Sequence, residues 1–309
     1  MKTCCRQAVW SGLGLAVLWI ATSVGLLQMY HHAWKSFALT TGSFSVDTVI
    51  LSPLCCAAGA AYGARLRRTG VTTTSRAWPR SATSAIVTIW VVGVGVVLLL
   101  SAGVTVAVLA WLAAGDADPR LVMGPVLTAM AATAFLALGA VLGVVAGSYL
   151  LAAVAAIGVY CVTSTIPGAA DLLIGWSGPA AIDGAPSHLT WQAIVLWAGL
   201  DCAVIVVSLL LVTVVTTPGG GHWWRWLGAA ILVAVIAVGA TATIQLEDVW
   251  ESTGDWRCRE VGRHGSMACV SGDMSWRLEE YATAMGRVDD LLMASGVQRR
   301  IVYAPEGGP

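Results

Sequence analysis

Long uncharged apolar runs constrain the fold of this chain more than any other feature of its sequence. A helix needs about 20 apolar residues to cross the roughly 30 Å hydrocarbon layer of a bilayer. Runs that reach or approach this length are Ala8–Tyr30, Thr48–Gly63, Ala82–Ala114, Trp191–Val215 and Leu227–Ile244. Only Trp191–Val215 contains a charged residue, Asp201. The pattern predicts an all-α polytopic membrane bundle.

The stretch Leu121–Ala170 is also uncharged and runs for 50 residues. This is more than twice the length of one crossing, so two antiparallel helices with a turn near Gly143–Ser148 fit it best. One crossing plus a segment that re-enters the membrane is the alternative. With two helices here, the sequence predicts about seven transmembrane helices.

Charge divides the chain into two predicted domains. Only 11% of all residues are charged, against about 25% in a soluble domain. Residues 251–309 nevertheless hold seven of the 17 basic and nine of the 17 acidic residues. We therefore expect a transmembrane helical bundle over residues 1–245 and a polar module over residues 246–309. The net charge of zero excludes a nucleic-acid-binding protein.

Lysine and arginine set the predicted orientation, because short cytoplasmic loops are enriched in them. If the N-terminus is cytoplasmic, the inner segments hold eight of these residues and the short outer loops hold only Lys35 and Arg120. The sequence thus predicts a multi-pass protein of the cell membrane with an extracytoplasmic C-terminus. The first apolar run is expected to remain as a span and not to be cleaved as a signal peptide.

The polar module is predicted to be a small extracytoplasmic α+β unit. Short strands are expected at Asp255–Cys258 and Ala268–Val270, and a closing strand at Arg300–Tyr303. Between them, apolar residues recur at spacings of three and four, which predicts a helix that stops at Gly296. Its apolar face comprises Leu278, Tyr281, Met285, Val288 and Leu292.

Two cysteines of this module, Cys258 and Cys269, are predicted to form a disulfide bond. Disulfides form in extracytoplasmic compartments, and small domains often depend on them. A bond that closes this short loop would stabilise the module by about 3 kcal/mol. The alternative is two free thiols in a cytoplasmic tail, which follows if the number of crossings is even.

Asp201 is the candidate residue for a translocation path. Placing an aspartate at the centre of a membrane helix costs about 2.5–3.5 kcal/mol, so such residues usually face the bundle interior or an aqueous cavity. The alternative is that the span begins later and that Asp201 lies near the outer headgroups.

Gly139, Gly143 and Gly147 repeat every four residues, a spacing that lets membrane helices pack closely. We expect this stripe to contact another helix. The alternative is that the predicted turn falls at Gly143, which would break the stripe.

Motifs for catalysis and nucleotide binding are absent from the sequence. The chain has only two lysines, Lys2 and Lys35, and neither lies in a G-x-x-x-x-G-K-[ST] loop. It also lacks an H-E-x-x-H zinc motif and a G-x-S-x-G nucleophile elbow. We therefore expect no enzymatic activity, no metal site and no cofactor in this chain.

The predicted architecture of residues 1–217 resembles the permease subunit of ABC-2-type exporters. The shared features are six spans with a cytoplasmic N-terminus, a basic inner loop after the second span and an irregular outer segment at Ile166–Pro179. The scarcity of lysine resembles membrane proteins of actinobacteria. The resemblance implies a homodimer and a separate cytoplasmic ATPase that docks on the inner loop. The loop's coupling arginines would be Arg65, Arg67, Arg68, Arg76 and Arg80.

Two functions are therefore compatible with the sequence. In the first, the chain is the membrane-spanning permease subunit of an ATP-driven exporter. In the second, it transports nothing and is a membrane-anchored binding or assembly subunit whose outer module contacts an extracytoplasmic partner. The first requires a bound ATPase and the second does not.

Overall fold

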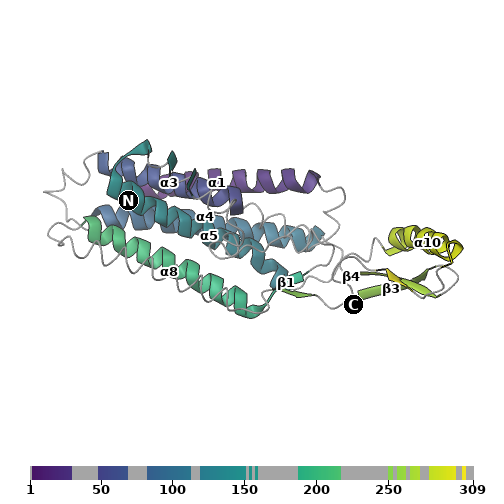
Figure 1. The fold of residues 1–309 in the computed structure, drawn as a ribbon. Coiled ribbons are helices and arrows are strands. Elements are labelled where there is room, and N and C mark those ends of the chain that lie inside the picture. The colour runs from purple at the N-terminus through teal and green to yellow at the C-terminus, as the bar shows by residue number, and fades with distance from the viewer. Residues whose placement is uncertain are drawn as a thin grey trace.

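The structure is a computed structural model in which long helices form an elongated bundle and a small α+β module lies beyond one end (Figure 1). The residues that it describes are 2–29, 48–68, 82–112, 119–150, 153–154, 157–158, 187–216, 250–252, 256–261, 265–271, 278–296 and 301–303.

Long helices make up the described part of the bundle, and they follow the apolar runs of the sequence. Four of them, α1, α4, α5 and α8, contain a segment that is long and apolar enough to cross a membrane. The remaining helix, α3, carries a proline at position 53 and three arginines in its last turn. The bounds are α1 Lys2–Met29, α3 Thr48–Arg68, α4 Ala82–Leu112, α5 Pro119–Ala146 and α8 Trp191–Thr216.

The fold is thus a helical, membrane-embedded bundle, while the predicted number of seven crossings stays a prediction. The predicted span Leu227–Ile244 lies outside the described residues, as does most of the second half of Leu121–Ala170. The predicted division of that stretch near Gly143–Ser148 agrees with the structure, because α5 ends at Ala146. Gly147 follows with a φ of 66°, a left-handed conformation that glycine adopts readily at the end of a helix.

The directions of the helices follow from the residues that face one another. Gly12 of α1 faces Val97 and Gly93 of α4 faces Ala8, so these two helices run parallel. Near the starts of α5 and α8, Leu127 packs against Ile194, so these two helices start at the same end of the bundle. We call this the module end, because the C-terminal module lies there (Figure 1).

The opposite end of the bundle, which we call the arginine end, brings together the start of α1 and the ends of α3 and α5. Arg6 and Arg65 line one groove there, and Arg67 bonds to the last turn of α5. The end of α5 and the start of α8 therefore lie at opposite ends of the bundle. The end of α8 and the strand that begins at Trp250 also lie at opposite ends of the bundle (Figure 1).

Helices α3 and α5 are in backbone-to-backbone contact through glycines on both sides. A Cβ atom at Gly59 would overlap the carbonyl of Leu136, and one at Gly143 would overlap the carbonyl of Ala60. Gly139 meets the carbonyl of Cys56 in the same way. The predicted contact of the glycine stripe is therefore confirmed, and the alternative of a turn at Gly143 is wrong, since α5 continues to Ala146.

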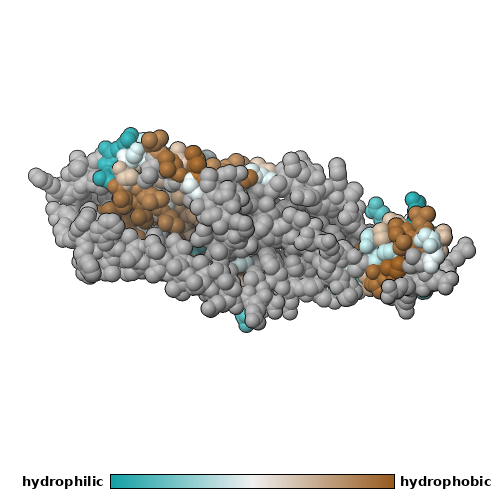
Figure 2. Space-filling model, viewed as in Figure 1, coloured by the Kyte–Doolittle hydropathy of each residue, from teal (hydrophilic) through white to brown (hydrophobic). Residues whose placement is uncertain are grey.

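The outside of the bundle remains apolar, as a surface in contact with lipid requires. Val17, Leu100 and Val195 are each at least 65% exposed. Figure 2 shows brown, apolar patches over the described part of the bundle. The core contains fully buried Trp19 and Trp197, so large side chains fill both the inside and the surface.

The C-terminal module contains the predicted strands and helix. Strands β3 (Trp256–Val261) and β4 (Ser266–Ser271) pair antiparallel, and β5 (Val302–Tyr303) pairs parallel to β4. Helix α10 (Leu278–Ala294) packs on β3 and β4. Gly296, with a φ of 92°, follows the end of this helix as predicted.

A second, two-stranded sheet joins the bundle to the module and was not predicted. Strand β1 (Ser187–Leu189) pairs antiparallel with β2 (Trp250–Ser252). Only Thr190 separates β1 from α8, and its Oγ1 accepts a hydrogen bond from the N–H of Ala193, which caps the start of that helix. The start of α8 is thus fixed to the segment that leads into β3.

We predict that Gly143→Ala destabilises the bundle. The added methyl group would overlap the backbone of Ala60, so α3 and α5 must move apart, which typically costs about 1–3 kcal/mol. Thermal unfolding of the full chain in detergent measures this loss. Gly103→Ala on α4 is the matched control, because its methyl group meets open space and should leave stability unchanged or slightly higher. Equal midpoints for the two variants would contradict the close contact.

Candidate functional site

Two of the predicted coupling arginines are bound to the end of α5. The guanidinium of Arg67 donates to the carbonyl of Val144 at 3.1 Å and also to that of Val145. Arg68 Nε donates to the carbonyl of Gly147 at 3.0 Å. The last carbonyls of a helix lack partners within the helix and carry its negative dipole end, so positive donors stabilise them. These arginines hold α3 and α5 together.

The other predicted arginines have different positions. Arg65 lines a groove at the arginine end, whereas Arg76 and Arg80 lie outside the described residues. Arg68 also stacks over the ring of Tyr149, 4.6 Å from its centroid. The three described arginines thus do not share one role, because Arg67 and Arg68 bind the end of α5 while Arg65 lines the groove. The coupling role of all five stays a prediction.

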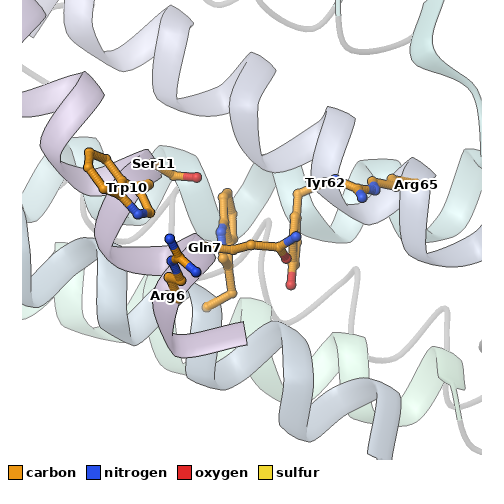
Figure 3. Close-up of a pocket in the computed structure, with 7 residues that line it drawn as sticks. Arg6, Gln7, Trp10, Ser11, Tyr62 and Arg65 are labelled. Atoms are coloured by element: carbon orange, nitrogen blue, oxygen red, sulfur yellow. The ribbon is translucent and has the colours of Figure 1, made fainter. Parts of the chain in front are cut away.

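A groove opens at the arginine end between α1, α3 and α4 (Figure 3). Its volume is about 360 Å³, and Tyr62 of α3 stacks on Trp90 of α4 in its wall, with ring centroids 4.0 Å apart. A wider part of about 520 Å³ continues along α1 past Gly14, Leu15 and Leu18. The lining residues of the narrower part are Arg6, Gln7, Trp10, Ser11, Tyr62, Arg65 and Trp90.

Sequence reasoning missed this groove because its polar residues come from segments far apart in the chain. Arg6 and Arg65 are both near ends of apolar runs. Arg6 served only to predict orientation, and Arg65 also served as one of the coupling arginines that the exporter resemblance implies. The predicted topology could have linked the two arginines, because it places both at the same depth, where a span meets the cytoplasmic surface of the membrane.

Asp201 faces the interior of the bundle, as predicted. Its side chain is only 4% exposed and lies on the buried face of α8, one or two turns from Trp197 and Ser208. Among the described residues, neither Asp201 Oδ2 nor Ser208 Oγ has a hydrogen-bond partner. The candidate membrane span of α8 begins at Trp191, ten residues before Asp201, and the depth of Asp201 in the membrane stays a prediction. The residue does not line the groove described above, and its part in a translocation path stays a prediction.

The predicted disulfide bond between Cys258 and Cys269 is present. The two residues are directly opposite each other on the antiparallel strands β3 and β4, with Cα atoms 4.0 Å apart. The bond therefore fixes the register of this hairpin. The alternative of two free thiols does not hold in this structure.

A buried polar cluster ties the helix of the module to its sheet and was not predicted. Asp289 of α10 is fully buried, and its Oδ1 accepts hydrogen bonds from Ser266 Oγ at 2.7 Å and from the Tyr303 hydroxyl at 3.0 Å. The N–H of Ile301 donates to Ser266 Oγ at 3.2 Å. One carboxylate thus connects α10 to β4 and β5.

The predicted apolar face of α10 is confirmed in part. Tyr281 and Met285 pack on the core of the module, whereas Val288 is 38% exposed. Ala282 and Asp289, seven residues apart, are the buried residues of the helix. Asp289 can be buried beside this face because Ser266 and Tyr303 donate hydrogen bonds to its carboxylate. No group of three His, Cys, Asp or Glu side chains among the described residues could hold a metal ion.

We predict that Asp201→Leu makes the bundle as stable as the wild type or more stable. The change removes a buried carboxyl group with an oxygen that lacks a described partner, and burial of such a group costs about 1–3 kcal/mol. Thermal unfolding in detergent is the measurement, with Asp201→Asn as the control that keeps size and polarity. A clear loss of stability in Asp201→Leu alone would mean that the carboxyl group is bound to a stabilising partner.

We predict that Tyr303 ionises at higher pH than an ordinary tyrosine. Its partial burial and its hydrogen bond to Asp289 raise the pKa of Tyr303 above 10. Because the folded state holds this proton more firmly than the unfolded state, the contribution to stability is complete below pH 10 and is lost as pH rises through the raised pKa.

An absorbance titration at 295 nm, taken as the difference between the wild type and Tyr303→Phe, isolates this group among the six tyrosines. Asp289→Asn should bring the midpoint back toward 10, since it removes the neighbouring carboxylate. A midpoint at or below 10 in the wild type would contradict the contact.

Comparison of the chain with protein-family models, with curated proteins and with solved structures finds no match. The case for a function therefore depends on the residues of this chain alone. The likeness to exporter permeases stays a prediction that depends on architecture.

Proposed function

We propose that this chain is a membrane-anchored binding or assembly subunit whose bundle holds a disulfide-bonded module at the membrane surface for contact with an extracytoplasmic partner. The observation that carries the proposal is the sheet of β1 and β2, which attaches the segment before the module to the start of α8. A freely tethered domain would not need such an attachment.

The connections on both sides of this sheet are short. One residue separates β1 from α8, and three separate β2 from β3. Short connections limit the distance between a domain and its support, because a chain spans at most about 3.6 Å per residue. The module is therefore presented at a restricted distance from the bundle, which suits a docking element.

The module is also reinforced internally. It has about 60 residues, and a core of that size is marginal by itself. The disulfide bond and the buried cluster around Asp289 compensate for the small core, because they connect β3 to β4 and α10 to the sheet. A module with these internal cross-links can present a fixed surface.

The surface that we propose for the partner is on α10. Leu291 is 70% exposed and Val288 is 38% exposed. Residues three apart are neighbours on a helix, so these two side chains form one small apolar contact area. We call this pair the α10 contact and propose that the partner covers it.

The proposal includes the orientation that the sequence predicts. Arg6, Arg65, Arg67 and Arg68 come together at the arginine end, and the positive-inside rule assigns such an end to the cytoplasm. The module end is then extracytoplasmic, where a disulfide bond is stable. The end of α8 and the start of β2 lie at opposite ends of the bundle. This supports the predicted orientation, because a further membrane crossing between α8 and β2 would place them in this way.

The permease subunit of an ATP-driven exporter is the second candidate, and the observation that favours it is Asp201. A buried acid inside a membrane bundle is by default a functional residue. This function requires an ATPase bound near the arginine end and two copies of the chain. With Arg67 and Arg68 bound to α5, the docking surface would depend on Arg76 and Arg80 instead.

Leu291→Asp tests the proposal, with Thr283→Asp as the matched control. Both residues are exposed on α10, but only Leu291 belongs to the α10 contact. A cross-linker that cannot cross membranes is applied to intact cells that carry the full chain, and cross-linked proteins are identified. We expect a cross-linked partner with the wild type and Thr283→Asp, and its loss with Leu291→Asp.

Equal cross-linking in both variants would contradict the α10 contact, and no cross-linking of the module in intact cells would contradict the orientation. An ATPase that co-purifies in mild detergent and is lost after Arg76→Glu and Arg80→Glu would support the exporter instead.

A further inference from the structure

We propose that the groove between α1, α3 and α4 binds an anionic phospholipid. In this arrangement the phosphate lies at Arg6 and Arg65, and an acyl chain follows α1 past Gly14 and Leu18. The proposal depends on the bundle being embedded in a membrane and not on the role of the C-terminal module.

The polar part of the groove fits a phosphate group. Two guanidinium groups come from different helices, and Gln7 and Ser11 add further hydrogen-bond donors. In Figure 3, Arg6 and Arg65 lie on either side of Gln7 and Tyr62. Arginine binds phosphate strongly because its planar donors match the phosphate oxygens. The described lining residues include two arginines and no aspartate or glutamate.

Aromatic residues place this polar part at the level of lipid headgroups. Trp10 is 65% exposed and lines the groove beside Arg6. Tyr62 and Trp90 stack in the opposite wall. Tryptophan and tyrosine are enriched at the membrane–water interface, because their rings combine an apolar body with one polar group.

The groove changes from polar to apolar along the bundle, which distinguishes a lipid from a free anion. Beyond Ser11 its lining is formed by Gly14, Leu15, Leu18 and, on α3, by Ala58 and Ala61. A Cβ atom at Gly14 would meet nothing within 4 Å, so space is open there. A free phosphate would use only the arginine end of this lining, whereas a phospholipid uses both parts.

The packing of the helices explains why space remains at this place. Helix α1 packs on α4 through Gly12 and Gly93, and α3 packs on α5 through its own glycines. These two close pairs leave α1 and α3 with little direct contact. A lipid in the groove would fill that gap and join the two pairs.

Native mass spectrometry and thermal unfolding of the full chain in detergent test the proposal. The probes are phosphatidylglycerol, the zwitterionic phosphatidylcholine and sodium phosphate. We expect phosphatidylglycerol to stay bound and to raise the unfolding midpoint, and the other two probes to do neither. Arg6→Gln and Arg65→Gln should each weaken phosphatidylglycerol binding about fivefold. Gly14→Leu should reduce retention by filling the space for the acyl chain.

Matched controls separate the groove from general effects. Arg259→Gln removes one exposed positive charge from the C-terminal module, and Gly199→Leu makes the glycine-to-leucine change at another position with open space. Both should bind phosphatidylglycerol as the wild type does. If an arginine variant does not fold, Gly14→Leu still decides the question.

Three results would overturn the proposal. Equal retention of phosphatidylcholine and phosphatidylglycerol would exclude recognition of a negative headgroup. Stabilisation by sodium phosphate as large as that by phosphatidylglycerol would assign the site to a soluble anion. Unchanged lipid retention in Gly14→Leu would exclude the acyl chain from the groove.

Discussion

The contact between α3 and α5 is the constraint on which the rest of the bundle depends. Apolar side chains gain little by leaving lipid, so membrane helices associate through close packing and polar contacts. Glycines on both helices let the backbones touch, and this contact brings Arg67 and Arg68 to the end of α5. It also positions Tyr62 and Arg65, which form one wall of the groove. A change in this one interface would therefore affect the core and the site together.

Basic residues near the ends of spans indicate the orientation of a membrane protein, but they do not show which groups those residues bind in the folded chain. Arg65, Arg67 and Arg68 are close together in the sequence, and a single role as a docking surface was expected for them. In the structure Arg67 and Arg68 bind backbone carbonyls, while Arg65 lines a groove. Helix ends need positive donors in any orientation, so a charge that sets topology can also hold two helices together.

Local patterns in the sequence predicted the helices, the hairpin and the disulfide bond, because each depends on residues near one another in the chain. The missed features depend on distant residues. Ser187 pairs with Ser252, and neither short strand has the alternation that would predict it. Asp289 resembles its exposed neighbour Asp290, and only the donors on Ser266 and Tyr303 explain its burial. Periodicity predicts a helix but does not identify a polar residue that faces the core.

The two proposed functions explain different parts of the molecule. An anchoring role explains the sheet of β1 and β2, the disulfide bond and the exposed Leu291, but it gives no reason for Asp201. An apolar residue at that position would cost the bundle less, since buried polar groups without full pairing are unfavourable. A transport role explains Asp201 and leaves the attachment of the module without a purpose. Under these proposals, Asp201 is the residue that tests a function of the bundle, and the surface of α10 is the one that tests a function of the module.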